Sequence, residues 1–236
     1  MSAHSLLLLL KGPMQAWGYD SRYTTRATHS MPTKSGVLGL LAAAQGRRRT
    51  DPLEDLVKLS FAVRIDQPGT LLRDFQTAAQ WQMHPGEAGK LVNRYYLADA
   101  AFLVAIEAPE RELLEGLADA LNHPKYPLFL GRRSCPVSVD LVQGIVDKPA
   151  VDALRDHSTW HATKTHKRER SAMVSLPIYR DAQPGEEGTR IQDIPVSFSP
   201  EHRKYQWRTV IEDTPLDIAN HDSQVNDDFI EAVMSA

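Results

Sequence analysis

Five consecutive leucines, Leu6–Leu10, stand close to the amino end of the chain. The run is far too short to span a bilayer, and no basic segment precedes it as in a signal peptide. Gly12-Pro13 follows it and stops a strand, because proline has no N–H to donate and glycine weakens a strand interior. We therefore predict a buried core strand over Ser5–Lys11 in a globular protein, whose 42% apolar residues can supply an ordinary core.

The segments after this strand alternate between helical and strand-like patterns. Thr33 offers an N-cap, and apolar residues recur at helical spacing from there to Gly46. Two β-like stretches separated by a turn-forming segment predict a protruding hairpin. The later elements that we predict are the strand Leu59–Asp66, the hairpin strands Leu71–Gln82 and Lys90–Ala98, the strand Ala101–Glu107 and the helix Glu110–Leu121.

This order favours an α+β fold, in which helices cover one face of an antiparallel or mixed sheet. We predict an RRM or ferredoxin-like domain over residues 1–122, with a protruding β-hairpin thumb at about 71–98. The regularity fades after Asn122, where a strand at Val139–Val146 and a short helix at Ala150–Asp156 precede short strands and loops. Residues 123–236 are predicted to form a smaller C-terminal β-rich region with an acidic tail.

Charge is distributed unevenly, although the formal net charge is only −3. Residues 1–50 hold seven Lys or Arg and one acid, whereas residues 212–236 hold seven acids and no Lys or Arg. One surface can therefore bind a polyanion while another faces solvent or a protein, although a charge run is more often a solvated face. The single Cys135 allows no intramolecular disulfide and no cysteine-based zinc site, and it fits a reducing cytoplasm.

The segment just past the first strand, Lys11–Gly18, contains a cation, an amide and an aromatic ring. Lys11 can hold a phosphate, Gln15 can bond to a base edge and Trp17 can stack on a base. The alternative is that Trp17 belongs to the core, which is the commoner place for tryptophan.

Thr33-Lys34-Ser35-Gly36 opens the first predicted helix, where free N–H groups and the helix dipole favour an anion. The alternative is a plain N-cap beside a solvated Lys34. The spacing is not that of a Walker A loop, so the sequence lacks the motif that usually indicates nucleotide hydrolysis.

Two further segments combine cations with groups that suit nucleic acid. Gly131-Arg132-Arg133-Ser134 places two guanidinium forks and a hydroxyl at a strand end. The hairpin adds cations, an amide and aromatic rings that suit bases displayed in a single strand. Because Tyr95 and Tyr96 are adjacent in a strand, at least one of them is expected in the core.

His157, His161 and His166 lie within ten residues and beside several cations. They could provide the acid and base of a metal-independent RNase, and His157 with His161 could form half of a metal site on a helix. No third ligand stands at metal spacing. An exposed, polar basic loop is the alternative that we favour.

Five blocks of sequence closely resemble the CasD family, the RAMP-superfamily subunits of type I-E CRISPR Cascade complexes. They lie in family order at residues 10–18, 32–41, 72–77, 94–102 and 130–136, and residues 198–207 match more loosely. The resemblance implies a subunit that grips the 5′ handle of CRISPR RNA with Lys11–Gly18, Lys34–Gly36 and Gly131–Ser134. It also implies a thumb, roughly Arg73–Tyr95, that presses on the guide beside the handle.

The resemblance further implies contacts with the CasC backbone subunits and the large subunit CasA, in a complex that also contains CasB and CasE and meets target DNA indirectly. We expect a non-catalytic, cytoplasmic RNA-binding subunit with no cofactor, no metal and no membrane contact. The alternative is a metal-independent endoribonuclease that processes CRISPR repeat RNA, as a related paralogue does in type I-C systems. The candidate RNA-binding residues are Lys11, Gln15, Trp17, Gly18, Arg22, Lys34, Ser35, Gly36, Arg47, Arg73, Gln76, Arg94, Tyr95, Arg132, Arg133 and Ser134.

Overall fold

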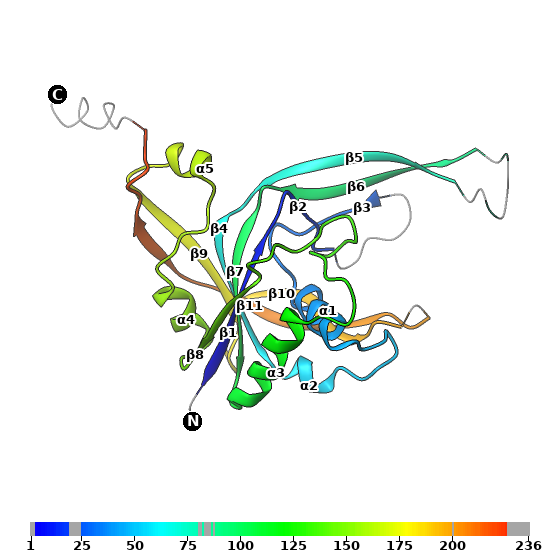
Figure 1. The fold of residues 1–236 in the computed structure, drawn as a ribbon, viewed down its shortest axis with the longest axis horizontal. Coiled ribbons are helices and arrows are strands. Elements are labelled where there is room, and N and C mark those ends of the chain that lie inside the picture. Colours follow the sequence, from blue (N-terminus) through cyan, green and yellow to red (C-terminus); the bar gives the residue numbers. More distant parts are fainter. Residues whose placement is uncertain are drawn as a thin grey trace.

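The centre of the fold is a seven-stranded sheet in the order β10-β11-β9-β4-β7-β1-β8 (Figure 1). The computed structural model describes residues 3–18, 25–79, 82, 86, 88–199 and 201–225. Four strands of the sheet, in the order β4-β7-β1-β8, together with two helices, have the topology of a ferredoxin-like domain. These elements are β1 (His4–Lys11), α1 (Lys34–Gln45), β4 (Ser60–Gln67), β7 (Ala101–Ala108), α3 (Arg111–Asn122) and β8 (Val142–Val146).

β1 occupies the middle of this domain, between β7 and β8, and is antiparallel to both. Leu6, Leu8 and Leu10 pack into the cluster formed with α1 and α3, and Leu7 packs on the other face against α4 (Ala150–Asp156). Both faces of the strand are therefore covered, which is why every second position need not be polar. The predicted core strand is confirmed.

The ends of α1 follow the signals in the sequence. The Thr33 side chain accepts a hydrogen bond of 3.2 Å from the Gly36 backbone N–H, as an N-cap does. Gly46 ends the helix with φ of 78°, a left-handed conformation that glycine adopts without strain. A short helix, α2 (Glu54–Val57), follows before β4.

The thumb is built from β5 (Thr70–Ala78) and β6 (Lys90–Ala98), and it protrudes from the sheet (Figure 1). At its base β6 also pairs with β2 (Met14–Gln15) and β3 (Thr25–Arg26). This second sheet ties the loop after β1 to the root of the thumb. The α+β class with its hairpin thumb is confirmed.

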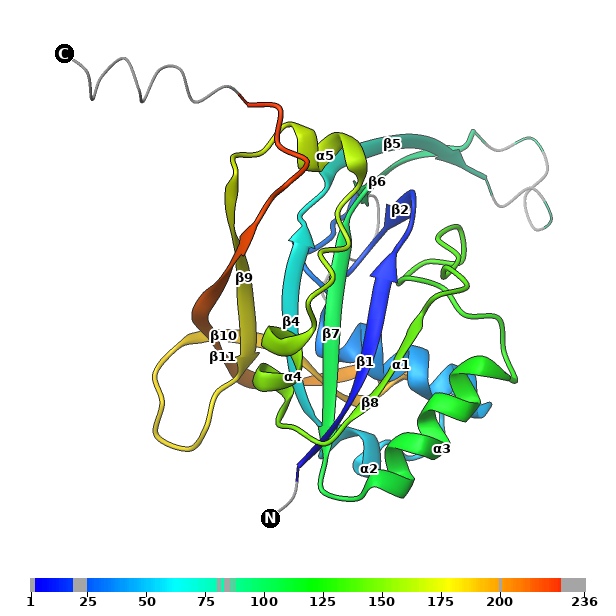
Figure 2. The same cartoon turned by 60° about the vertical axis from the view of Figure 1, so that its left-hand side comes forward.

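The carboxy-terminal strands extend the main sheet beyond β4 (Figure 2). They are β9 (Met173–Asp181), β10 (Thr189–Ser197) and β11 (Lys204–Ala219), preceded by α5 (Lys164–Arg168). The first half of β11 pairs with β10 and the second half with β9, so β11 is much longer than the short strands that we expected. The predicted boundary after Asn122 therefore separates parts of one sheet, because β8 and β9 to β11 all belong to it.

The acids near the carboxyl end begin inside this sheet. Asp213 in β11 pairs with Arg155 and Arg180, so that part of the acidic segment is ordered and neutralised by the protein itself. The acids after Val225 lie outside the described residues. None of the described helices is long and apolar enough to cross a membrane.

Candidate nucleic-acid interface

Three of the predicted segments meet in space at the base of the thumb. The Ala16 backbone N–H donates to the Leu130 carbonyl at 3.1 Å, which places Lys11–Gly18 directly against Gly131–Ser134. A Cβ atom on Gly36 would lie 2.8 Å from the Trp17 ring, so the start of α1 touches the same loop. The three segments that the resemblance groups together are therefore in contact in the structure.

Gln15 and Trp17 face the interior of this junction. The Gln15 amide donates to the Leu10 and Ala100 carbonyls at 2.9 and 2.8 Å, and its oxygen accepts from the Trp17 indole N–H at 3.0 Å. Their exposed fractions are 0% and 1%. Trp17 therefore belongs to the core, as the alternative interpretation expected. The buried Gln15 and Trp17 side chains hold the Lys11–Gly18 loop in place.

The start of α1 already faces an anion, which is a carboxylate of the chain itself. The Lys34 backbone N–H donates to Asp193 at 2.7 Å, and the Lys34 ammonium pairs with Asp181 at 2.8 Å. Arg208 bridges the same two carboxylates. Lys34 and Ser35 are each 5% exposed. Neither the helix start nor the Lys34 charge is open to an external phosphate in this arrangement.

Arg132 and Arg133 are adjacent in sequence but have different surroundings. The Arg132 guanidinium donates to the backbone carbonyls of Tyr95, Arg26 and Ala27, at 3.0, 2.9 and 3.4 Å. The Arg133 and Ser134 side chains are exposed. Within the described part of the chain, Arg133 makes no hydrogen bond or ion pair. Arg132 therefore fastens the loop to the root of the thumb, while Arg133 presents a free fork to the surface.

Tyr96 also belongs to this site, although it was not among the candidate RNA-binding residues. Its ring lies 4.6 Å from the Arg132 guanidinium carbon, and its hydroxyl lies 3.5 Å from the Ser134 hydroxyl. Burial raises the pKa of Tyr96, but hydrogen bonds with Ser134, Arg132 and Arg94 outweigh this effect and hold the pKa below its ordinary value. Strand alternation required one of Tyr95 and Tyr96 to face inward, and the structure shows that it is Tyr96, with 3% exposed.

The remaining candidate residues fall into two groups. Lys11, Gly18 and Arg94 lie at the base of the thumb, and exposed Arg26 joins them although it was not among the candidates. The Arg94 Nε atom is buried without a hydrogen-bond partner among the described residues. Arg47 pairs with Asp55, and on the thumb Arg73, opposite Tyr95, donates to Asn93 at 2.9 Å while Gln76 donates to Asp74 at 2.5 Å. Arg22 lies outside the described residues.

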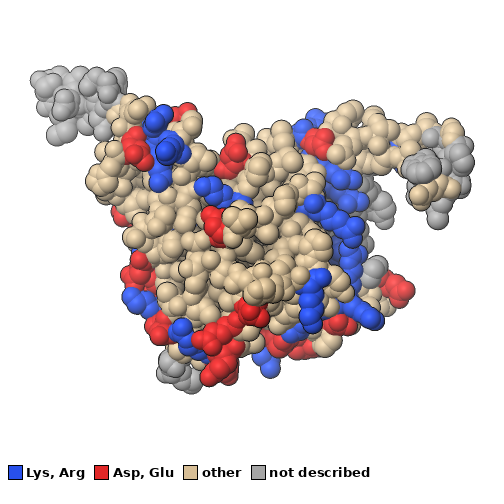
Figure 3. All heavy atoms as spheres, in the orientation of Figure 1, with Lys and Arg blue, Asp and Glu red and all other residues tan. Residues whose placement is uncertain are grey.

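Lys and Arg side chains gather in a band on the surface (Figure 3). The band runs from the base of the thumb down the same side of the molecule, toward the outer ends of β10 and β11. A chain with a net charge of −3 therefore still presents a cationic surface. Such a surface attracts a polyanion through its local field rather than through the net charge.

The three histidines lie on α5 and the segment between α4 and α5, and two of them are in contact. His157 Nε2 and His161 Nε2 are 2.9 Å apart, and their rings are stacked. The His161 backbone N–H donates to Asp66 at 2.7 Å. No group of three or more His, Cys, Asp or Glu side chains that could hold a metal ion is found among the described residues. The pair is therefore part of the packing around Asp66, not half of a complete metal site there.

This pair predicts a loss of stability in mild acid. Burial lowers the pKa of both imidazoles below 6.5, so the unfolded chain binds more protons than the folded one as the pH falls below that value. The contribution of these two histidines to the free energy of unfolding is fully present above about pH 6.5, and it is lost as the pH falls through their lowered pKa values in the folded protein. Urea unfolding between about pH 8 and pH 5 should show a shallower decline for His157→Gln/His161→Gln than for the natural chain. The exposed His202→Gln is the control, and an equal change in both variants would remove the pair as the cause.

Comparisons with known proteins agree with this architecture. The sequence matches the family described as CRISPR-associated protein (Cas_Cas5) over residues 5–211. It is 38% identical over 156 residues to the CRISPR system Cascade subunit CasD of Escherichia coli (strain K12), a match that covers 59% of this chain and 70% of that protein. Two solved structures share the fold. One, titled CRISPR RNA-guided surveillance complex, has a TM-score of 0.76 and 30% identity over 98% of both chains.

The other solved structure is titled Crystal structure of Cas protein. It has a TM-score of 0.67 and 34% identity, and the match covers 93% of this chain and 97% of that one. The family match spans β1 to β11 and so includes the thumb, the loop after β1 and the Gly131–Ser134 loop. The chain therefore belongs to the Cas5 family of CRISPR-associated proteins.

Proposed function

We propose that this chain is a non-catalytic subunit of a CRISPR surveillance complex and that it binds the 5′ handle of the guide RNA at the base of the thumb. The observation that carries the proposal is the junction of Lys11–Gly18 with Gly131–Ser134, beside which Arg26 and Arg133 are exposed and Lys11 and Arg94 are half-buried. The likeness to CasD, named as a Cascade subunit, supports the same assignment.

Four side chains form the proposed contact surface: Lys11, Arg26, Arg94 and Arg133. Arg133 and Arg26 neutralise phosphates at the surface, and the half-buried Lys11 and Arg94 add positive charge beside them. Gln15, Trp17, Lys34 and Arg132 position this surface, because their polar atoms are already bonded within the protein. Handle binding then depends on a rigid junction that carries a few free cations.

The proposed partners are those of the type I-E complex. The thumb meets the guide and the adjacent CasC subunit, and the body of the molecule lies beside the large subunit CasA, with CasB and CasE elsewhere in the complex and target DNA met indirectly. Several apolar side chains of the thumb are exposed in this chain, including Leu71, Phe75 and Leu91 at 61%, 58% and 55%. Apolar surface of this extent on a protruding hairpin fits a partner contact.

The direct test is incubation of the purified chain with its repeat RNA, alone and with the partner subunits, followed by a gel that reports retention and cleavage together. Retention that depends on the handle sequence, with intact RNA, is expected. Cleavage at one site that is abolished by a His or Tyr substitution in this chain would establish the endoribonuclease instead.

The two arginines of the loop give a sharper prediction. Arg133→Ala should weaken handle binding about tenfold and lower the salt slope of log K by about 0.7, because one charged contact to a single strand is lost. Its thermal unfolding should match that of the natural chain. Arg132→Ala should lower the unfolding temperature as well, because three backbone carbonyls lose their donor. Arg168→Ala, on α5, is the control for charge alone, and an equal loss of binding in this control would overturn the assignment of Arg133.

A further inference from the structure

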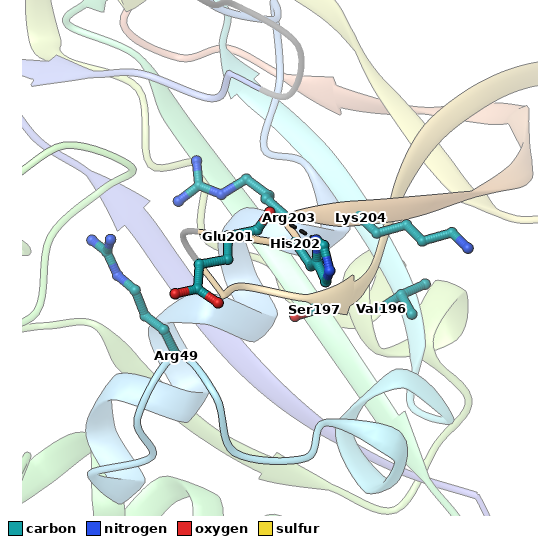
Figure 4. Close-up of a pocket in the computed structure, with 7 residues that line it drawn as sticks. All are labelled: Arg49, Val196, Ser197, Glu201, His202, Arg203 and Lys204. Atoms are coloured by element: carbon teal, nitrogen blue, oxygen red, sulfur yellow. Dashed lines mark hydrogen bonds between the residues drawn. The ribbon is translucent and has the colours of Figure 1, made fainter.

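A hollow of about 740 Å³ lies between the loop after α1 and the turn that joins β10 to β11 (Figure 4). Arg49 enters it from the loop, and Arg203 and Lys204 enter it from the turn and the start of β11. Glu201 contributes a carboxylate, and His202 lines the hollow as well. In Figure 4 the guanidinium groups of Arg49 and Arg203 extend to one side, and Lys204 extends to the other. None of these residues belongs to the proposed handle interface.

The cations of the hollow are not neutralised within the described residues. The side chains of Arg49, Arg203 and Lys204 make no hydrogen bond or ion pair there, unlike those of Lys34, Arg47 and Arg132, which all bind groups of the protein. Three cations and one carboxylate give the hollow a positive excess. Arg49 and Arg203 extend to the same side, and an external anion would relieve the repulsion between their like charges.

The guanidinium groups and the position of the hollow favour a phosphodiester backbone as that anion. Guanidinium forks match phosphate oxygens, and the joined ends of β10 and β11, which help to form the hollow, lie on the side of the molecule where the cationic band runs (Figures 1 and 3). The acidic end of the chain itself starts elsewhere: the Gln224 backbone N–H donates to the Arg168 carbonyl, so this end leaves the fold beside α5. We propose that the hollow is a second phosphate-binding site, which holds the backbone of a single-stranded nucleic acid independently of its sequence.

The test uses the full chain and fluorescent single strands of equal length, in RNA and DNA, whose sequence is unrelated to the handle. Anisotropy across a salt series measures affinity and salt slope. Arg49→Ala/Arg203→Ala should weaken binding about tenfold and lower the slope by about 1.4, since each contact to a single strand contributes about 0.7. Arg168→Ala/Arg170→Ala removes the same charge at α5 and should leave the slope unchanged.

Glu201→Gln is the variant that separates a binding site from a structural role. Removal of the carboxylate should strengthen binding about twofold to threefold, which is the size of one exposed charge interaction. If Arg49→Ala/Arg203→Ala loses affinity for RNA alone, the ligand is the guide, and if it loses affinity for DNA alone, the ligand is a target strand. Either result supports the phosphate site.

Unchanged binding in Arg49→Ala/Arg203→Ala would overturn the proposal. An equal loss in the α5 control would also overturn it. If Arg49→Ala/Arg203→Ala instead loses binding to a poly-glutamate peptide while its binding to the nucleic-acid strands is unaffected, the ligand is an acidic protein and the proposal is wrong. Because the strands lack the handle sequence, failure of this site leaves the handle assignment intact, and Arg133→Ala tests that assignment separately.

Discussion

Arg64→Met is expected to lower the free energy of unfolding by about 3–5 kcal/mol, the cost of breaking a buried ion pair by removing one partner. Arg64 lies in β4 with 1% of its side chain exposed, and its partner Asp66 is 0% exposed. The guanidinium donates to both Asp66 oxygens, at 2.7 and 3.0 Å. The variant would leave this carboxylate buried without its cation.

The Arg64 guanidinium also caps the carboxyl end of α4. It donates to the carbonyls of Leu154, His157 and Thr159, each at 2.7 Å, and these lie in the last turn of α4 and the segment that follows. Carbonyls at a helix end have no partner within the helix, so the loss of Arg64 leaves three acceptors unsatisfied. Arg64→Lys should fail to restore stability, because an ammonium cannot replace the planar fork.

Urea unfolding of the purified chain measures this effect. Arg111→Met is the matched control, since Arg111 is 41% exposed on α3 and its ion pairs with Glu115 and Asp147 lie at the surface, where solvent screens such pairs and they add little stability. If Arg64→Met and Arg111→Met lose equal amounts of unfolding free energy, the burial of Arg64 and its partners is not what makes their interaction stabilising.

Gly131→Ala should destabilise the chain by at least about 1–3 kcal/mol and should weaken handle binding more than Arg133→Ala does. The added Cβ would lie 1.7 Å from the Ala16 carbonyl oxygen, a separation that no side chain can tolerate. Gly131 also has φ of 84°, which strains any residue with a Cβ. The loop must therefore move away from Lys11–Gly18, and the proposed RNA surface is formed by that contact.

Gly185→Ala separates the two causes. Gly185 has φ of 91° and nothing within 4 Å of an added Cβ, so it has the strain without the clash. Thermal unfolding and handle binding of both variants should show a larger loss at Gly131. Equal losses at the two positions would mean that the close approach to Ala16 is not what holds the junction together.

Much of the fold was predictable because local patterns decide it. The leucine run predicted β1, Thr33 and Gly46 predicted the ends of α1, and the turn-forming segment between two β-like stretches predicted the thumb. The extent of the main sheet was not predictable, since the pairing of β4 with β9 joins residues more than a hundred positions apart. No local pattern reports such a partner.

The candidate site divides in the same way. The motifs identified the loops that meet at the base of the thumb, but they could not tell a free cation from one used by the protein. Lys34 is paired with Asp181, 147 residues away, whereas Arg133 is exposed beside Arg132, whose guanidinium donates to three backbone carbonyls. The choice between binding and support depends on partners that only folding brings together.

By itself, the sequence determined the core strand, the caps of α1, the thumb and the segments that surround the candidate interface, because hydrophobic periodicity, capping and turn chemistry act between near neighbours. The tertiary structure alone decided which of those residues face outward. Burial and long-range ion pairing fix that choice, since a buried charge must find a partner wherever the fold places one.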